Sequence, residues 1–270
     1  MAVQVKFAVR SEVGNVRKNN EDNFYCNGIF MTVSERERPF FLSGMTDSPA
    51  IFAVCDGMGG EDCGELASLT AVQTLQEHSR SILQGIMKTD ESIAYEAVHE
   101  YIRDTNRKLL GIMRSQGIRM GSTLVTAVVG EDSFTLYNLG DSRGFRVNDG
   151  RLLLATNDHT VAAEKVRMGL LTPAQGEKSR EKHMLTRFLG DNEEWGAMPD
   201  ASRRFSFDEH TGGLMCSDGL TDMLTFREIA EIMKNNPEPA DAVNKLVESA
   251  LEHGGHDNVT CLVFRVEKGE

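Results

Sequence analysis

Aspartate residues recur along this sequence at places where their carboxylates could do chemistry. Each of the five flanks the expected end of a β-strand: Asp22, Asp56, Asp141, Asp218 and Asp257. Strand ends can meet at one rim of an antiparallel sheet, and carboxylates crowded there repel one another unless cations lie between them. Oxygen ligands of this kind suit Mg²⁺ or Mn²⁺, and two such ions can generate a hydroxide and direct it at a phosphate ester. The alternative is that each aspartate belongs to a turn, which explains one such residue better than five.

The residues around Asp56 show how one of these acids is placed. Residues 51–55 are all apolar, which predicts a strand buried on both faces that stops at Asp56. Residues 57–60 contain three glycines, so the backbone can approach a ligand closely there. Asp62 is then predicted as the N-cap of a helix. Residues 213–219 repeat this design of apolar strand, aspartate and glycine.

A charged loop, residues 14–23, precedes the second expected strand. It carries Glu21 and Asp22 near one guanidinium, that of Arg17. A solvated turn accounts for such a loop, but paired acids near an arginine are also what a metal and phosphate site uses. Both interpretations stay open on these residues alone.

The elements that must position these residues are mainly strands joined by short links. Apolar runs and alternation predict strands in residues 3–9, 24–33, 124–129, 133–139, 145–147, 152–154 and 259–264. Short links make several of them antiparallel neighbours. Apolar stripes and capping residues predict helices in residues 66–75, 93–112, 225–235 and 240–251. The pattern is that of an α+β protein.

Residues 157–200 are the least regular part of the chain, and we expect them to pass over the site. A short helix is predicted to begin after Thr172. Four basic side chains could meet an anionic substrate, although solvation is the simpler role for each: Arg180, Lys182, His183 and Arg187. His159 and His183 have no second histidine or cysteine at ligand spacing, which argues against zinc. Elsewhere, we expect residues 35–38 to be exposed and residues 40–49 to form a connection.

Composition limits the class of protein. With 29 Lys and Arg against 41 Asp and Glu, the net charge of −12 opposes binding to nucleic acid or anionic lipid. A length of 270 residues without a linker or repeat fits one domain. Five cysteines without a C-x-x-C pair fit a reducing compartment. No signal-peptide core or membrane-spanning apolar run is present, so we expect a cytoplasmic protein.

Six motifs contain or accompany these acids. In chain order they are Gly14-x-x-Arg17-x-x-Asn20-Glu21-Asp22, Asp56-Gly57-Met58-Gly59-Gly60, Gly121-Ser122-Thr123, Gly140-Asp141-Ser142-Arg143, Ser217-Asp218-Gly219 and Gly255-x-Asp257-Asn258-Val259-Thr260. Together they closely resemble the PPM family of metal-dependent protein serine/threonine phosphatases, the type 2C group, in its bacterial form. The resemblance implies one domain over residues 1–270, built as a four-layer αββα sandwich of two antiparallel sheets flanked by helix pairs. It also implies a variable flap at about residues 165–190 that takes part in substrate choice.

The resemblance assigns metal ligands among the matched residues. Asp56 would bridge two ions, Mg²⁺ or Mn²⁺. The backbone carbonyl of Gly57 would bind the second ion, and Asp218 and Asp257 would complete the first. Asp141, together with Asp218, would hold a third and looser ion.

Three residues of the first motif would act on water and substrate. Glu21 and Asp22 would hold metal-bound waters, and Arg17 would bind the substrate phosphate through its planar fork. Met58 departs from many eukaryotic relatives, which have histidine there as the general acid. Because a thioether cannot donate a proton, the leaving group must take its proton from metal-bound water or elsewhere.

The resemblance therefore implies hydrolysis of phosphoserine and phosphothreonine in proteins by attack of a hydroxide that bridges the metal ions. The partners would be phosphoprotein substrates of a serine/threonine kinase, and we expect a monomer without nucleic-acid or membrane partners. Two alternatives are a catalytically inactive domain of this family that binds partners, and a phosphatase of small metabolites. Cys55, Cys63 and Cys216 lie near the site in sequence, but the arginine-rich phosphate loop of cysteine phosphatases is missing, so we expect packing roles for them.

Overall fold

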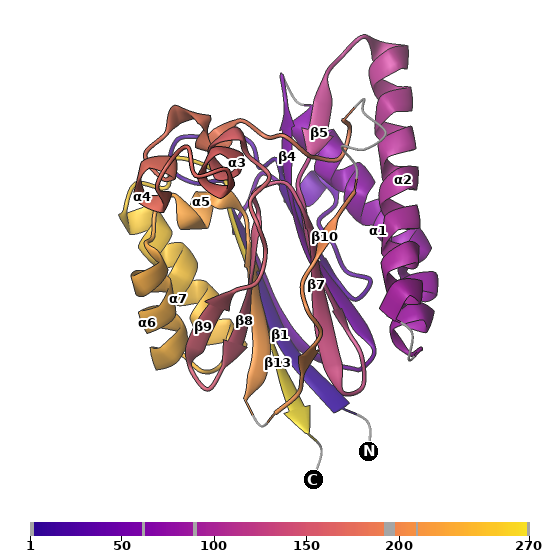
Figure 1. Ribbon diagram of the computed structural model, residues 1–270, viewed down its shortest axis with the longest axis vertical. Helices are drawn as coiled ribbons and strands as arrows, with labels where there is room; N and C mark the ends of the chain where they lie inside the picture. Colours follow the sequence, from indigo (N-terminus) through magenta and orange to yellow (C-terminus); the bar gives the residue numbers. More distant parts are fainter. Residues whose placement is uncertain (1–2, 61–62, 89–90, 192–197, 209, 269–270) are drawn as a thin grey trace.

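The structure is a computed structural model that describes residues 3–60, 63–88, 91–191, 198–208 and 210–268. Two antiparallel sheets pack face to face, and helices cover the outer face of each sheet (Figure 1). This arrangement is the four-layer αββα sandwich expected from the resemblance, and it confirms the α+β prediction. Among the described residues, no helix combines the length and apolarity needed to cross a membrane.

The first sheet has six strands in the order β3-β1-β13-β12-β8-β9. Their bounds are β1 (Val3–Glu12), β3 (Phe40–Asp47), β8 (Arg143–Asn148), β9 (Arg151–Leu154), β12 (Thr211–Cys216) and β13 (Val259–Lys268). Two helices pack on the outer face, α6 (Phe226–Asn235) and α7 (Pro239–Glu252). Thr225 caps α6 together with Glu228, as predicted, because each satisfies a free backbone N–H of the other.

The second sheet follows the order β10-β7-β6-β4-β2, with β5 paired to β4 and β11 paired to β7. Its strands are β2 (Asp22–Cys26), β4 (Ala50–Gly59), β5 (Met120–Ser122), β6 (Leu124–Val129), β7 (Ser133–Leu139), β10 (Asp200–Ala201) and β11 (Phe205–Ser206). Helices α1 (Gly64–Ile86) and α2 (Glu91–Gln116) cover it. Asp62, predicted as the N-cap of this first helix, lies outside the described residues.

Aromatic side chains fill the space between the two sheets. The Phe52 ring from β4 stacks on the Phe264 ring from β13, with ring centroids 5.4 Å apart. Phe134 from β7 meets Phe264 edge-on at 5.2 Å. Such contacts stabilise the pair of sheets beyond simple area burial, and they hold the strand ends in fixed positions.

Expectations about three strands in the N-terminal third were wrong. The strand predicted to stop at Asp56 continues to Gly59 as β4. The strand predicted over residues 24–33 ends at Cys26, because Asn27 and Gly28 adopt positive φ angles of 44° and 107° and turn the chain. Residues 40–49 are not merely a connection, since β3 pairs along β1 as the edge strand of the first sheet. Its side chains are mostly exposed, and a half-exposed edge strand gives a weak apolar signal.

The remaining short elements gather at one end of the sandwich, opposite the two termini (Figure 1). They are α3 (Val161–Arg167), α4 (Pro173–Gly176), η2 (Arg180–His183) and α5 (Asp218–Thr221), whereas η1 (Val33–Glu35) precedes β3. Helix α4 begins after Thr172 with the predicted capping box. Residues 157–191 therefore do pass over one end of the sheets.

Gly57 marks a close junction of three segments at this end. Its N–H donates to the Glu21 carbonyl at 3.1 Å. A Cβ atom at this position would lie 2.0 Å from the Gly64 carbonyl oxygen and 2.6 Å from that of Glu21. Only glycine lets β4, α1 and the loop before β2 meet here.

We predict opposite effects for two glycine-to-alanine changes. Gly57→Ala should destabilise the protein by about 1–3 kcal/mol, because the added methyl group collides with backbone atoms that cannot move independently. Gly111→Ala is the matched control within α2, where nothing lies within 4 Å of the added Cβ. That change should stabilise the protein by about 0.5–1 kcal/mol. Urea unfolding of both variants checks this, and equal effects would contradict the close junction.

Candidate active site

Asp22 and Asp56 occupy opposite positions on the antiparallel strands β2 and β4. Asp22 is 1% exposed, and its Oδ2 accepts a hydrogen bond from the Ser217 hydroxyl at 2.7 Å. Burial, with the added charges of Asp218 and Asp257, raises the pKa of Asp22 to about 7. The sheet register thus brings two acids together that are far apart in sequence.

Asp56 lies close enough to the other four predicted aspartates for their charges to act on its carboxylate. Burial raises the pKa of Asp56 well above its usual range, and four neighbouring carboxylates raise it further: Asp22, Asp218, Asp141 and Asp257. Thr123 holds the backbone of Asp56 in place. The Asp56 N–H donates to Thr123 Oγ1 at 2.9 Å, and the Asp56 carbonyl accepts from the Thr123 N–H at 2.8 Å.

The other three aspartates come from separate chain segments at the same rim. Asp218 is the first residue of α5, immediately after β12, and Asp257 lies two residues before β13. Asp141 follows β7, and burial, together with the charges of Asp218 and Asp158, raises its pKa to about 7. The sequence-based selection of strand-end acids therefore identified residues that the fold brings together.

Arg17 and Glu21, from the charged loop, border this aspartate cluster. The Arg17 Nη2 atom lies 2.7 Å from Asp257 Oδ2 in a half-exposed ion pair. Glu21 is half-buried, and burial raises its pKa against the opposing effect of Arg17. Arg17, which is predicted to bind the substrate phosphate, thus lies beside the predicted acids.

Gly64 is a part of the site that the sequence reasoning missed. A Cβ atom there would lie 2.6 Å from Glu21 Oε1 and 2.8 Å from the Gly57 carbonyl oxygen. Both oxygens therefore lie where the side chain of any residue larger than glycine would be. The signal was present in the sequence as the first glycine after the glycine-rich loop.

Asn258 was quoted within a motif but had no assigned role. Its Oδ1 accepts the Glu21 N–H at 2.8 Å, and its Nδ2 donates to the carbonyls of Val13 and Asn19, each at 2.8 Å. One buried amide therefore fixes the charged loop against the start of β13. Partners more than 230 residues away could not be recognised from the sequence.

Arg36 corrects the expectation that residues 35–38 are exposed. Its side chain is 4% exposed and donates to Ser68 Oγ and to the Asn20 carbonyl, each at 3.3 Å. Burial lowers its pKa to about 10, although the nearby charges of Glu65 and Asp22 act in the opposite direction. A buried cation thus lies close to the acids and offsets part of their charge.

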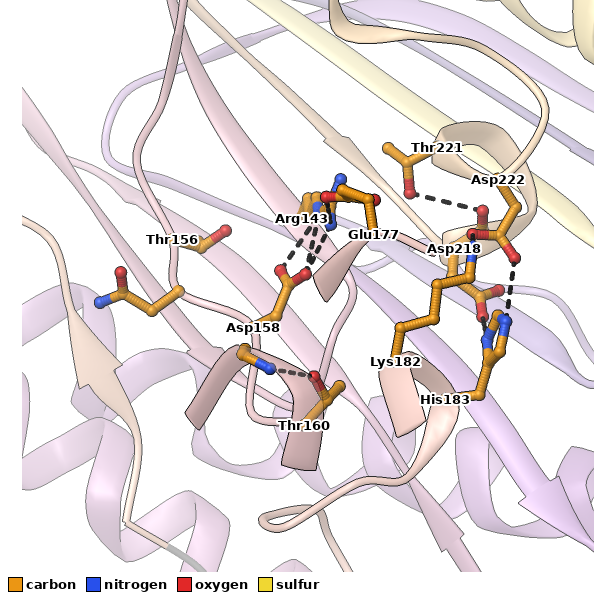
Figure 2. Close-up of polar contacts among 12 residues, drawn as sticks. Arg143, Thr156, Asp158, Thr160, Glu177, Lys182, His183, Asp218, Thr221 and Asp222 are labelled. Atoms are coloured by element: carbon orange, nitrogen blue, oxygen red, sulfur yellow. Dashed lines mark hydrogen bonds and ion pairs between the residues drawn. The ribbon is translucent and has the colours of Figure 1, made fainter. Parts of the chain in front are cut away.

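Residues 157–191, which pass over this end of the sheets and form an excursion from them, contribute two basic side chains near the cluster (Figure 2). His183 Nδ1 lies 3.7 Å from Asp218 Oδ2, and its Nε2 lies 3.6 Å from Asp222 Oδ2. Lys182 Nζ donates to Asp222 Oδ1 at 2.8 Å. The other two basic candidates do not meet the cluster: Arg187 pairs with Asp200 at 2.9 Å, and Arg180 is exposed.

His159 ties the excursion to the turn that carries Asp141. It is fully buried, and its Nδ1 accepts the Gly140 N–H at 3.0 Å. Its Nε2 lies 3.3 Å from Asp200 Oδ2, and Asp200 pairs with Arg187. Burial lowers the pKa of His159 to about 4, so the imidazole is neutral at pH 7.

The donor set at this rim fits divalent cations such as Mg²⁺ or Mn²⁺. Hard oxygen atoms dominate it, and the raised pKa values of Asp22, Asp56 and Asp141 show carboxylates whose charges are incompletely neutralised by the protein. Among the described residues, the ion pairs to the five aspartates come from Arg17 and His183.

The fold and this site define a family of metal-dependent phosphatases. The sequence profile of the protein phosphatase 2C family matches residues 9–259. The chain belongs to this family, which confirms the resemblance found in the six motifs.

Curated relatives extend over nearly the whole chain. The serine/threonine phosphatase stp of Listeria welshimeri is 28% identical over 256 residues, which cover 94% of this chain and 93% of the relative. The protein phosphatase PhpP of Streptococcus pneumoniae serotype 2 is 27% identical and is covered to 98%, as is this chain.

Solved structures agree with the fold. The Mycobacterium tuberculosis serine/threonine phosphatase PstP has a TM-score of 0.78 and 29% identity, with 98% of this chain and 100% of that chain covered. The catalytic domain of PstP in complex with 2 manganese ions has a TM-score of 0.77 and 28% identity, with the same coverage of both chains.

We predict that His159 makes stability depend on pH between about 4 and 6.5. The pKa of this imidazole is lower in the folded protein than in the unfolded chain, so the unfolded chain binds more protons in that interval. The stability that the neutral imidazole contributes is complete above pH 6.5 and is lost as the pH falls towards 4, by up to roughly 3 kcal/mol. His159→Gln should remove this part of the pH dependence. The prediction would be contradicted if the free energy of unfolding changed with pH in the same way for the variant and the wild type.

Proposed function

We propose that this chain hydrolyses phosphoserine and phosphothreonine in proteins, with divalent cations held by the aspartate cluster. The observation that carries the proposal is the convergence of four carboxylates on Asp56, with Arg17 at their edge. Membership of the protein phosphatase 2C family supports the reaction. The relatives in Listeria and Mycobacterium that are named serine/threonine phosphatases support the substrate class.

The metal ligands that we propose are the ones implied by the family motifs. Asp56, the Gly57 carbonyl, Asp218 and Asp257 would hold two Mg²⁺ or Mn²⁺ ions, and Asp141 with Asp218 would hold a third. Bound cations would lower the pKa of a water molecule and neutralise charge on the phosphate. The catalytic domain of PstP, which shares the fold, is in complex with 2 manganese ions, and this supports the binding of two ions here.

Two acids would orient the attacking water. Asp22 is held in place by the Ser217 hydroxyl at 2.7 Å, and the Glu21 backbone is held by Asn258 at 2.8 Å. Carboxylates fixed in this way accept hydrogen bonds from water in a constant direction. A water molecule that is already oriented in this way loses less entropy when it reaches the transition state.

Arg17 would bind two phosphate oxygens through its guanidinium. Its present partner is Asp257, and this ion pair is half-exposed, so it contributes little to stability. The guanidinium can therefore exchange one carboxylate for a phosphate without a large loss. Met58 adds no acid to the site, and the leaving alcohol would take its proton from water or from another group.

We further propose a single catalytic domain with a flap at about residues 165–190 that contributes to substrate choice. Its partners would be phosphoproteins modified by a serine/threonine kinase, and the protein would act as a monomer in the cytoplasm. The five cysteines form no disulfide within the described residues, which supports a reducing compartment, and four of them are buried, in keeping with packing roles. An inactive, partner-binding domain is disfavoured because every matched ligand position retains its acid. The remaining alternative is a phosphatase of small metabolites. A comparison of phosphoproteins with phosphorylated metabolites as substrates tests that alternative.

We predict that Asp56→Asn lowers kcat for a phosphothreonine peptide by at least about a hundredfold, because the central anionic ligand is lost. Without added metal the variant should be at least as stable as the wild type, because the substitution removes one buried charge from a group of acids that repel one another. Asp132→Asn, in the hairpin between β6 and β7, is the matched control and should keep full activity. Undiminished hydrolysis by Asp56→Asn would remove the basis of the proposal.

We predict that Arg17→Ala raises KM for the same peptide by about tenfold, with a smaller change in kcat. Arg17→Lys should fall between the wild type and the alanine variant, because it keeps the charge but lacks the planar fork. Steady-state kinetics on the three proteins provides the comparison. Identical KM values would show that Arg17 is a surface residue without a role in phosphate binding.

A further inference from the structure

A cavity of about 730 Å³ lies beside the aspartate cluster, between the excursion and the first sheet. Its walls come from α3, α4 and η2 on one side and from β8, β9, α5 and α6 on the other. The volume falls within the roughly 300–1,000 Å³ of typical ligand pockets. Asp141 and Asp218 line it and also belong to the aspartate cluster, so the cavity is continuous with the proposed catalytic site.

One wall of this cavity is apolar. It is formed by Phe145, Leu154, Leu224, Phe226 and Ile229, and Val166 of α3 faces the cavity from the other side. Leu154 lies opposite Phe145 in the pairing of β8 with β9, and the rings of Phe145 and Phe226 have centroids 6.3 Å apart. Leu154 is 41% exposed and Phe226 is 51% exposed. Phe145, Leu224 and Ile229 are buried, so the argument depends on Leu154 and Phe226. Two large apolar side chains that stay open to water in a concave surface favour an apolar ligand, because its binding would remove them from water.

The basic side chains of the cavity already have partners, and Figure 2 shows those of Arg143, Lys182 and His183. Arg143 makes a forked contact with Asp158, with its Nη2 at 2.6 Å and its Nε at 3.0 Å from the carboxylate oxygens. Lys182 donates to Asp222 at 2.8 Å. An ionic ligand would have to displace these carboxylates, whereas an apolar ligand leaves them in place. The chemistry of the cavity therefore favours an apolar occupant.

We propose that this cavity binds large apolar side chains that flank the phosphorylated residue of a protein substrate. The inference rests on the proposed function, because it assumes that the phosphorylated residue lies at the aspartate cluster. A peptide chain that leaves the cluster past Asp141 and Asp218 enters the cavity within a residue or two, since both aspartates line it. The contacts there select substrates by sequence rather than by the phosphate alone.

The test compares three phosphothreonine peptides and one aryl phosphate. The peptides carry a Leu-Phe pair before the phosphothreonine, the same pair after it, or alanines on both sides. We expect one apolar peptide to have a KM about tenfold below that of the alanine peptide in the wild type, with a similar kcat. The aryl phosphate has no flanking residues and serves as the reference for the chemical step.

Two adjacent leucines of β9 give matched variants. Leu154 lines the cavity, whereas Leu153 is 47% exposed and does not line it. Leu154→Ala should lower the ratio of kcat/KM for the preferred peptide to kcat/KM for the aryl phosphate by about three- to tenfold, and Leu153→Ala should leave this ratio unchanged. Phe226→Ala tests the same wall from a different element and should resemble Leu154→Ala.

The outcomes separate the two proposals. Equal KM values for all three peptides in the wild type would overturn the cavity proposal and leave the proposed function intact. A preference that persists in Leu154→Ala and Phe226→Ala, or that falls equally in Leu153→Ala, would also overturn it. A wild-type protein that hydrolyses neither the peptides nor the aryl phosphate with Mn²⁺ would instead contradict the proposed function.

Discussion

The mutual repulsion of five aspartates at one rim of the sandwich is the constraint that the rest of the structure must satisfy. Antiparallel pairing of β2 with β4 sets Asp22 opposite Asp56, and the strand β12 delivers Asp218 to the same place. Aromatic packing between the sheets holds these strands together against the repulsion. Arg17 from one side and the buried Arg36 from another supply positive charge, but the raised pKa values show that the compensation is incomplete. A cation site is the physical consequence of acids held in this way.

A second consequence concerns the excursion over the site, which is anchored to the rim at several points. Ser122 bridges to Leu189, and the His159 N–H donates to the Gly140 carbonyl at 3.0 Å. Lys182 reaches Asp222, the residue that ends the short helix bearing Asp218. The position of this segment is therefore coupled to the position of the acids. A separate, freely moving lid would show few such contacts with the core.

The sequence allowed the acids to be found because each aspartate lies in or beside a strand whose apolar pattern is strong. The sandwich itself followed from six motifs in family order, whereas periodicity alone indicated only an α+β protein. Asn258, Gly64 and His159 were missed because their partners are distant in sequence and a single asparagine, glycine or histidine carries no pattern. Arg36 was placed at the surface since arginine is rarely buried without a carboxylate. The edge strand β3 escaped because a half-exposed strand resembles a loop in its composition.

The central claim is that the five aspartates act by binding divalent cations that take part in phosphate ester hydrolysis. The most direct measurement is a titration of the chelator-treated wild-type protein with Mn²⁺, in which calorimetry follows ion binding and phosphate release from a phosphothreonine peptide is followed in parallel. The account predicts tight binding of two ions per chain and activity that appears as these sites fill. Hydrolysis that persists in the chelator, or full activity without tight binding of any ion, would contradict it.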